Sequence, residues 1–338
     1  MNFKKVSNLT GWLVFAISFI VYFFSVERTG SLWDCGEFIT GAYKLEVVHP
    51  PGAPLFLLIG RIFTLFAEVL SNDPADIAFA VNMMSGVCGA FTAAFVAWST
   101  IMLSKLATVG REDIVDQGQV FSLAGAGLVA GLATAFSTSI WFSAVEGEVY
   151  AMSTFFTAMT FWALIKWYFL PEEDSYTNRW LIFSIFSAGL SIGVHLLSLL
   201  TFPALAVFVY LKGREKVTIK GIFIAAGLGT LTIGVIQKLI IVGIPSLWLK
   251  FELFTVNSLG LGVHSGIVPV LLIIAGLAYF GIKKAHEKGN RILEAIVVSA
   301  MLVVVAYSTV GIVVVRANAN TPINMNAPSD VTRLLPYL

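Results

Sequence analysis

Gly52-Ala-Pro-Leu-Phe-Leu-Leu-Ile-Gly-Arg-Ile-Phe-Thr-Leu-Phe-Ala-Glu-Val-Leu-Ser71 determines the topology of this chain, because every membrane crossing inverts the side on which all later residues lie. The stretch is long and apolar enough to cross, but it contains Arg61 and Glu68, and neither has an evident partner. A charge at the centre of a bilayer costs at least about 2.5 kcal/mol. A helix at the membrane surface avoids this cost. We therefore predict that 52–71 does not cross.

The composition of the whole chain excludes a soluble protein. Of 338 residues, 57% are hydrophobic and 12% are charged, whereas soluble domains carry about 25% charged residues. Repeated apolar runs of about 20 residues are each long enough to span a hydrocarbon core of about 30 Å. They predict an all-α membrane protein, a polytopic helical bundle of about nine transmembrane helices. The expected spans are 9–26, 77–104, 119–138, 150–170, 180–196, 198–212, 221–243, 267–283 and 292–315. A formal net charge of +1 gives no argument for nucleic-acid binding.

The basic residues indicate the orientation. If 52–71 does not cross and the N-terminus is cytoplasmic, 14 of the 21 Lys and Arg residues are cytoplasmic; if it crosses, only six are. The 14 are Lys4, Lys5, Lys105, Arg111, Lys166, Arg179, Lys212, Arg214, Lys216, Lys220, Lys283, Lys284, Lys288 and Arg291. Cytoplasmic loops carry an excess of Lys and Arg, so the first topology is favoured. Residues 27–76 then form a long extracytoplasmic loop with juxtamembrane helices.

Two acidic residues lie three positions apart in Trp33-Asp-Cys-Gly-Glu-Phe38. If this segment is helical, Asp34 and Glu37 share one face. Such a pair suits general-base catalysis, in which one carboxylate takes a proton from a hydroxyl and the other positions that group or holds a cation. The same spacing is equally consistent with the water-facing side of an interfacial helix.

Further polar residues are expected on the same side of the membrane. His49 precedes two prolines that stiffen the chain, and its ring could donate to a phosphate or pair with the carboxylates. Glu146, Glu148 and Tyr150 open the fourth span in Val145-Glu-Gly-Glu-Val-Tyr150. The two acids could cap a helix N-terminus, which favours negative charge. They could also bind a hydroxyl or a divalent cation, with Glu148 as the candidate metal ligand.

Three more candidates lie near the outer ends of later spans: His195, Lys238 and Arg316. His195 could be a packing residue, and Lys238 could extend its side chain to the interface. A lipid substrate that bears a phosphate needs a cation at about that depth. We therefore take Lys238 and Arg316 as candidate phosphate ligands and His195 as a candidate substrate ligand.

The motifs Trp33-Asp-Cys-Gly-Glu-Phe38 and Val48-His-Pro-Pro-Gly-Ala-Pro-Leu55 resemble those of a membrane family once catalogued as a domain of unknown function. That family is grouped with the protein O-mannosyltransferase-like glycosyltransferases and is distantly similar to enzymes of the C-type glycosyltransferase fold. Those enzymes have an acidic first-loop motif, a His-Pro-Pro or similar element and a second acidic loop, in this order. The segment from Arg316 to Asn324 resembles the family's junction with a soluble region. We expect a transmembrane domain at 1–315 and the start of a truncated extracytoplasmic tail at 316–338.

The resemblance implies an inverting transfer of a mannose-like sugar on the extracytoplasmic side. The donor would be a polyprenyl- or dolichyl-phosphate sugar, and the acceptor a Ser or Thr hydroxyl of an exported polypeptide. Asp34 would be the general base with Glu37 in support, although Cys35 and Gly36 separate two acids that are adjacent in the distant relatives. Glu148 or Glu146 would hold the second acidic position, and a divalent metal is compatible with these residues. The Lys-rich start and compact loops suit a bacterial inner membrane, with an endoplasmic-reticulum membrane as the alternative.

A transporter or flippase of lipid-linked sugars is the alternative function. Transporters place their binding charges near the bilayer midplane, often in repeated halves of the chain. This sequence has no evident repeat, and its ionisable residues gather toward one face. The pattern therefore favours the transferase.

Overall fold

The computed structural model describes residues 2–338 apart from 72, 112–113, 172–177, 213 and 215. The described residues form helices and no strand, apart from an isolated parallel bridge between Val47 and Asn324. The α-helices are α1 Phe3–Ser25, α2 Cys35–Lys44, α3 Pro54–Leu70, α4 Pro74–Thr108, α5 Gln117–Ala135, α6 Thr138–Val145, α7 Val149–Phe169, α8 Asn178–Leu190, α9 Phe202–Leu211, α10 Ile219–Val235, α11 Gly243–Asn257, α12 Ile267–Glu287, α13 Arg291–Tyr307, α14 Gly311–Ala317 and α15 Val331–Tyr337.

Six helical segments of the described chain are long and apolar enough to cross a membrane. They are Phe3–Ser25, Pro74–Thr108, Gln117–Ala135, Ile219–Asn257, Ile267–Glu287 and Arg291–Ala317. The predicted all-α, multi-pass membrane protein is confirmed, whereas the count of nine crossings stays a prediction. The expected spans 180–196 and 198–212 correspond to α8 and α9, which have only 13 and 10 residues. Two 3-10 turns, η1 Ser191–Gly193 and η2 Leu196–Thr201, join them.

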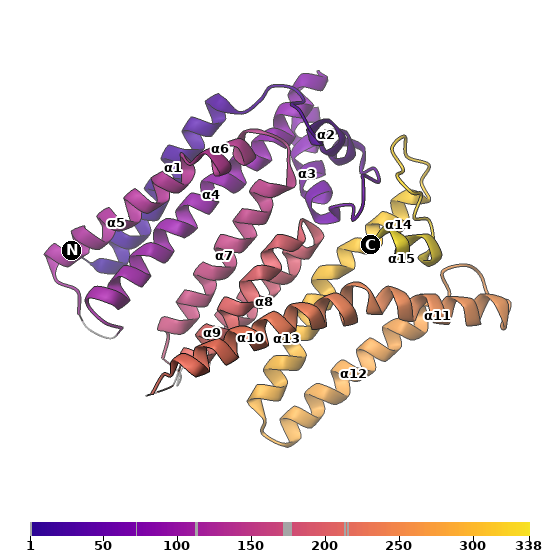
Figure 1. Ribbon diagram of the computed structural model, residues 1–338. Coiled ribbons are helices and arrows are strands. Elements are labelled where there is room, and N and C mark those ends of the chain that lie inside the picture. The colour runs from indigo at the N-terminus through magenta and orange to yellow at the C-terminus, as the bar shows by residue number, and fades with distance from the viewer. Residues whose placement is uncertain (1, 72, 112–113, 172–177, 213, 215) are drawn as a thin grey trace.

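Small residues let the long helices approach α4 closely. Helix α4 packs against α1, α5 and α7, and its alanines at 90, 93, 94 and 97 have no exposed surface. A methyl group added to Gly131 of α5 would lie 3.0 Å from the carbonyl oxygen of Ala93. Membrane helices use such small residues because van der Waals packing, rather than the hydrophobic effect, holds them together in lipid. Figure 1 shows these helices running side by side.

Residues 244–266, which lie between the expected spans 221–243 and 267–283, are largely helical. Helix α10 continues into a π-helical turn, η3 Ile236–Ile241, and after Val242 the chain leads directly into α11. Pro245 falls in the first turn of α11 and is compatible with a helix there, because first-turn amides need no helical acceptor. The helix ends only at Asn257, and the turn that follows is held by Glu252, which accepts a hydrogen bond of 2.8 Å from the amide of Gly266.

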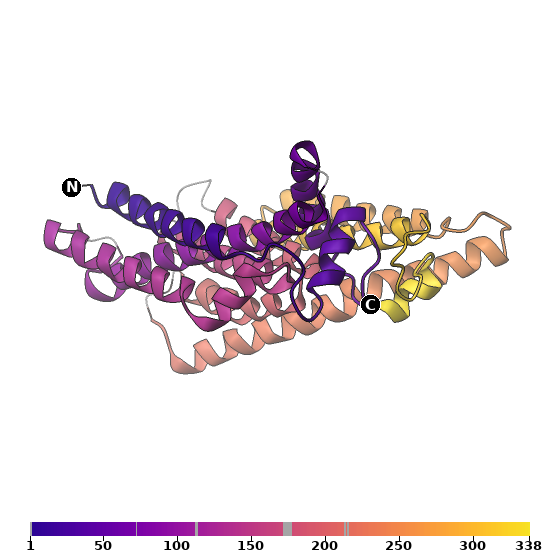
Figure 2. The same ribbon diagram turned by 90° about the horizontal axis from the view of Figure 1, so that it is seen from above.

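Helix α3, the segment on which the topology depends, packs against α2, α4 and the turns that end α8 and α13. Figure 2 shows α3 standing out from the long helices at a steep angle. The expectation that Arg61 and Glu68 lack a partner is wrong: Arg61 Nη1 lies 3.1 Å from Glu68 Oε2, and it also donates to the Tyr43 carbonyl at 2.7 Å. The charge pair is thus compensated within the protein, and the case against crossing rests on the basic residues and on the placement of α3.

Candidate active site

The first acidic motif lies at the start of α2. Asp34 is the N-cap residue of this helix, but its side chain makes no capping hydrogen bond, so its carboxylate is exposed and free. The apolar side of α2 is buried through Cys35, Phe38 and Ile39. Trp33, just before the helix, has φ of 61°, which is unusual for a bulky residue and is typical of functional sites.

A pocket of about 330 Å³ brings the two predicted acidic segments together. Asp34 contributes from the first loop, and Glu146, Glu148 and Tyr150 contribute from the turn between α6 and α7. Trp33, Phe142 and Ser143 complete the lining. Residues more than a hundred positions apart in the sequence therefore present three carboxyl groups to one cavity.

A buried thiol links the two segments. Cys35 Sγ lies 3.4 Å from Glu146 Oε2 and 3.6 Å from Glu148 Oε1, and the hydroxyl of Ser31 contacts both the thiol and Glu146. Burial raises the pKa of Cys35 to about 12, and the neighbouring acids add to the effect. The thiol therefore stays protonated and can donate to the carboxylates.

Glu148 is the most buried of the pocket acids, with 8% of its surface exposed. Burial raises the pKa of Glu148, because it disfavours the charged carboxylate. The nearby Asp34 raises this pKa further, because two negative charges repel each other. Although Glu148 is the N-cap residue of α7, its side chain makes no capping hydrogen bond. The backbone amide of Val149, the first residue of α7, acts on this carboxyl, and the macrodipole of α7 favours negative charge here, so helix capping stays an alternative to substrate or metal binding.

Glu37 and His49 form a close pair beside Asp34. The backbone amide of His49 donates to Glu37 Oε1 at 2.7 Å, and His49 Nδ1 lies 2.8 Å from Glu37 Oε2. Single donor atoms of Asp34, Glu37 and His49 all lie within 4.8 Å of one another. Two carboxylates and an imidazole are a donor set that suits a divalent transition metal. The cluster can therefore hold a cation or, without one, fix the carboxylate of Glu37.

The remaining predicted residues are only partly drawn into this site. The ring of His195 lies 5.5 Å from the ring of Tyr150, which lines the pocket. Arg316 donates to the carbonyls of Lys44 and Leu45 at 2.9 and 2.6 Å, at the end of α2. Lys238 lies in the π-helical turn with an exposed side chain, and it forms no ion pair with another described residue.

Two residues that the sequence analysis did not select hold the site together. Asn82 of α4 is 1% exposed, and its amide donates at 2.9 Å to the carbonyls of both Glu27 and Thr29 in the first loop. Its oxygen faces Gly147, between the two acids of the second loop. The sequence signal that could have identified Asn82 was a polar amide side chain within an otherwise apolar span. Tyr337, whose hydroxyl donates to the Val48 carbonyl, gave no such signal.

Comparisons with known proteins find relatives of one kind. The model of the protein O-mannosyl-transferase TMEM260 N-terminal domain matches residues 34–218. The chain is 27% identical over 214 residues to protein O-mannosyl-transferase tmem260 of Dictyostelium discoideum, and 30% identical over 182 residues to protein O-mannosyl-transferase TMEM260 of Mus musculus. These alignments cover 60% and 53% of this chain but only 24% and 22% of the relatives. No solved structure matches.

Proposed function

Since the chain belongs to the family of the protein O-mannosyl-transferase TMEM260 N-terminal domain, we propose that it is a glycosyltransferase that moves a mannose-like sugar onto proteins. The donor is a polyprenyl- or dolichyl-phosphate sugar, and the acceptor is a Ser or Thr hydroxyl of an exported polypeptide. The relatives' names supply the reaction class. The donor and the site residues come from the motifs and from the chemistry of the pocket.

One observation carries this proposal: Asp34, Glu146 and Glu148 meet in one pocket. Asp34 is the exposed acid with a free carboxylate, so it takes the proton of the acceptor hydroxyl. The hydroxyl oxygen attacks the anomeric carbon as the bond to the lipid phosphate breaks, and the phosphate leaves with the bonding electrons. The attack comes from the face opposite the leaving group and inverts the anomeric centre.

The other residues have supporting roles. His49 holds Glu37 through two contacts below 3 Å, which keeps a second carboxylate beside Asp34. Glu148, whose pKa is raised, donates a hydrogen bond to a sugar hydroxyl in its neutral form. A divalent metal at Asp34, Glu37 and His49 would stabilise negative charge on the phosphate. His49, Lys238 and Arg316 stay candidates for contact with that phosphate, and His195 and Tyr150 for contact with the substrate.

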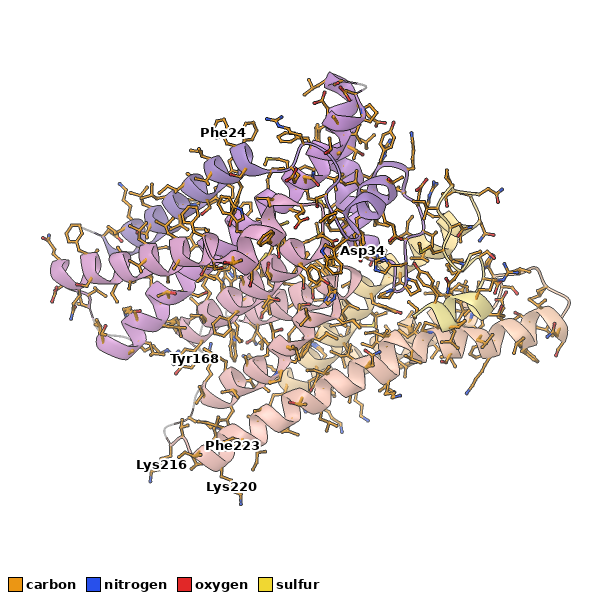
Figure 3. All side chains as sticks on the ribbon, turned by 45° about the horizontal axis from the view of Figure 1, so that its top comes forward. Phe24, Asp34, Tyr168, Lys216, Lys220 and Phe223 are labelled. Carbon is orange, nitrogen blue, oxygen red and sulfur yellow. The ribbon has the colours of Figure 1, made fainter. Side chains whose placement is uncertain are left out.

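We place the reaction on the extracytoplasmic side of the membrane, with the N-terminus in the cytoplasm. Figure 3 shows Asp34 far from Lys216 and Lys220, which lie toward the other end of the molecule. This separation of Asp34 from the basic residues at 216 and 220 supports the orientation that the positive-inside rule favours. The two relatives come from eukaryotes, so they lend no support to the predicted bacterial inner membrane.

The decisive experiment is Asp34→Asn in the purified chain, reconstituted in nanodiscs with a mannosyl-phospho-polyprenol and a Ser- and Thr-containing peptide. We expect transfer to fall at least about a hundredfold, the scale of a lost general base. Asp76→Asn, an isosteric change at an exposed acid in the first turn of α4, is the matched control and should retain activity. Wild-type transfer by Asp34→Asn would remove Asp34 from the mechanism. Lipid movement by the wild-type chain without peptide modification would favour the flippase.

A further inference from the structure

The segment 316–338 returns to the first loop and is bonded to it along several residues. Arg316 donates to the carbonyls of Lys44 and Leu45. The amide of Val47 donates to the Ile323 carbonyl at 3.1 Å, and the amide of Met325 donates to the Val47 carbonyl at 3.0 Å. These contacts hold the short stretch that leads from the end of α2 to His49. Figure 1 shows α14 and α15 beside the end of the molecule that carries α2 and α3.

Tyr337 makes the last of these contacts. Its hydroxyl donates to the carbonyl of Val48, and only 1% of the residue is exposed. Its ring belongs to the hydrophobic cluster that also contains Val313 and Leu334. A methyl group on Gly52, whose φ is 89°, would lie 2.7 Å from the Tyr337 hydroxyl oxygen, so this glycine leaves room for the contact.

The hydroxyl is also close to the acidic site. Burial raises the pKa of Tyr337, and the charge of Glu37 raises it further, so the phenol stays neutral and remains a donor. Val48 directly precedes His49, whose amide and ring both contact Glu37. A displacement of the Val48 carbonyl therefore moves the two groups that fix Glu37 beside Asp34.

We propose that Tyr337 is a positioning residue of the active site: by holding the Val48 carbonyl, it sets the place of His49 and thereby of the Glu37 carboxylate. Tyr337 touches no reacting atom, and its effect passes through His49. The catalytic part of this inference rests on the proposed function. The placement of His49 does not, so the two can fail separately.

Tyr337→Phe keeps the ring and removes only the hydroxyl. Tyr307→Phe is the matched control, because Tyr307 lies in the same hydrophobic cluster, is 5% exposed and donates to the Ile241 carbonyl at 2.9 Å, away from the first loop. In the nanodisc assay we expect Tyr337→Phe to lower kcat by about tenfold with KM nearly unchanged, since small misplacement of catalytic groups costs this much or more. Tyr307→Phe should keep the wild-type kcat.

A second measurement does not depend on transfer. The chain has four histidines, so the ring signal of His49 can be assigned in a ¹³C-histidine NMR spectrum with His49→Gln. We expect that signal alone to move in Tyr337→Phe and to stay in Tyr307→Phe. Tyr337→Phe should also add no further loss of kcat in a His49→Ala background, because the tyrosine acts through that histidine.

Three outcomes would overturn the inference. The two tyrosine variants could lose equal amounts of kcat, the losses of Tyr337→Phe and His49→Ala could add, or the His49 signal could stay unmoved in Tyr337→Phe. A Tyr337→Phe protein that fails to fold when Tyr307→Phe folds would also overturn it, because the role would then be one of stability. A wild-type chain that transfers no sugar but shows the selective NMR change would reject the proposed function and retain the placement of His49.

Discussion

At the scale of single residues, the acidic pocket brings an exposed acid, Asp34, together with a buried one, Glu148. Burial, together with the nearby Asp34, raises the pKa of Glu148. Pairs of acids with different pKa values allow one group to accept a proton while the other donates. The burial of Glu148 is therefore part of the proposed chemistry.

The raised pKa of Glu148 makes a prediction about stability. The native state keeps a proton on Glu148 above its ordinary pKa of 4.5, whereas the unfolded state releases it. This contribution to stability is thus present below pH 4.5 and is lost as pH rises through the native pKa. Glu148→Gln should remove the loss, so the thermal midpoint of the variant relative to the wild type should rise as pH increases above 4.5 and level off once the pH passes the native pKa of Glu148. Parallel midpoint curves would show that Glu148 ionises normally, and Glu287→Gln on the exposed end of α12 should follow the wild type.

Gly147 makes a second prediction at this scale. A methyl group there would lie 2.7 Å from Asn82 Oδ1 and 3.1 Å from Ile39, and Asn82 also holds Glu27 and Thr29. Gly147→Ala should therefore displace both acidic loops and lower the initial transfer rate by more than about tenfold. Gly125→Ala, with no atom within 4 Å of the added carbon, is the control. Equal rates for the two variants would show that the loops adapt.

The sequence predicted the acids of the site because their chemistry is visible in the residue types and motifs. It did not identify Asn82 or Tyr337, because both act by hydrogen bonding to backbone carbonyl groups that only the fold brings near them. Tyr337 lies 289 positions from Val48, and no periodicity or motif connects the two. Positions that act through backbone contacts are thus the part of a site that a single sequence conceals.

At the scale of elements, helix α3 determines whether the two acidic loops share a compartment. If α3 does not cross, α4 and α5 alone separate the first loop from the second, and both lie on one side; if it crosses, they lie on opposite sides. Cysteines at Gly36 and Ser139, both exposed, should then react with a membrane-impermeant maleimide from the same side. A cysteine at Lys220 should react only after permeabilisation. The two native cysteines are buried, which keeps the background low, and labelling of only one loop would contradict the proposed site.

The sequence located most helices because long apolar runs have few alternatives in a membrane. It did not predict that helical structure resumes in α11 directly after the span 221–243, where η3 Ile236–Ile241 precedes α11 and Pro245 lies in the first turn of α11. It also could not show that Arg61 and Glu68 pair with each other, since they lie seven residues apart along α3. Both differences arise from contacts or helix geometry that hydropathy does not record.

At the scale of the whole molecule, the acids of the pocket give a test of the proposed lipid-linked donor. Its lining contains three carboxyl groups, from Asp34, Glu146 and Glu148, and no Lys or Arg. A nucleotide sugar would bring a diphosphate next to these acids, and any ionised carboxylate among them repels it at short range. The proposed lipid-linked donor would place a neutral sugar in the pocket and keep its single phosphate toward the membrane.

The expected outcome is transfer from mannosyl-phospho-polyprenol and none above background from GDP-mannose, measured with the same peptide, chain and nanodiscs. Detergent-solubilised protein serves as a control for access, because a water-soluble donor needs no bilayer to reach the pocket. If the three acids cause the selectivity, Glu146→Gln should give measurable transfer from GDP-mannose and should change transfer from the lipid donor less. A wild-type chain that prefers GDP-mannose would contradict this argument, since the pocket would then have to bind a diphosphate against three carboxyl groups.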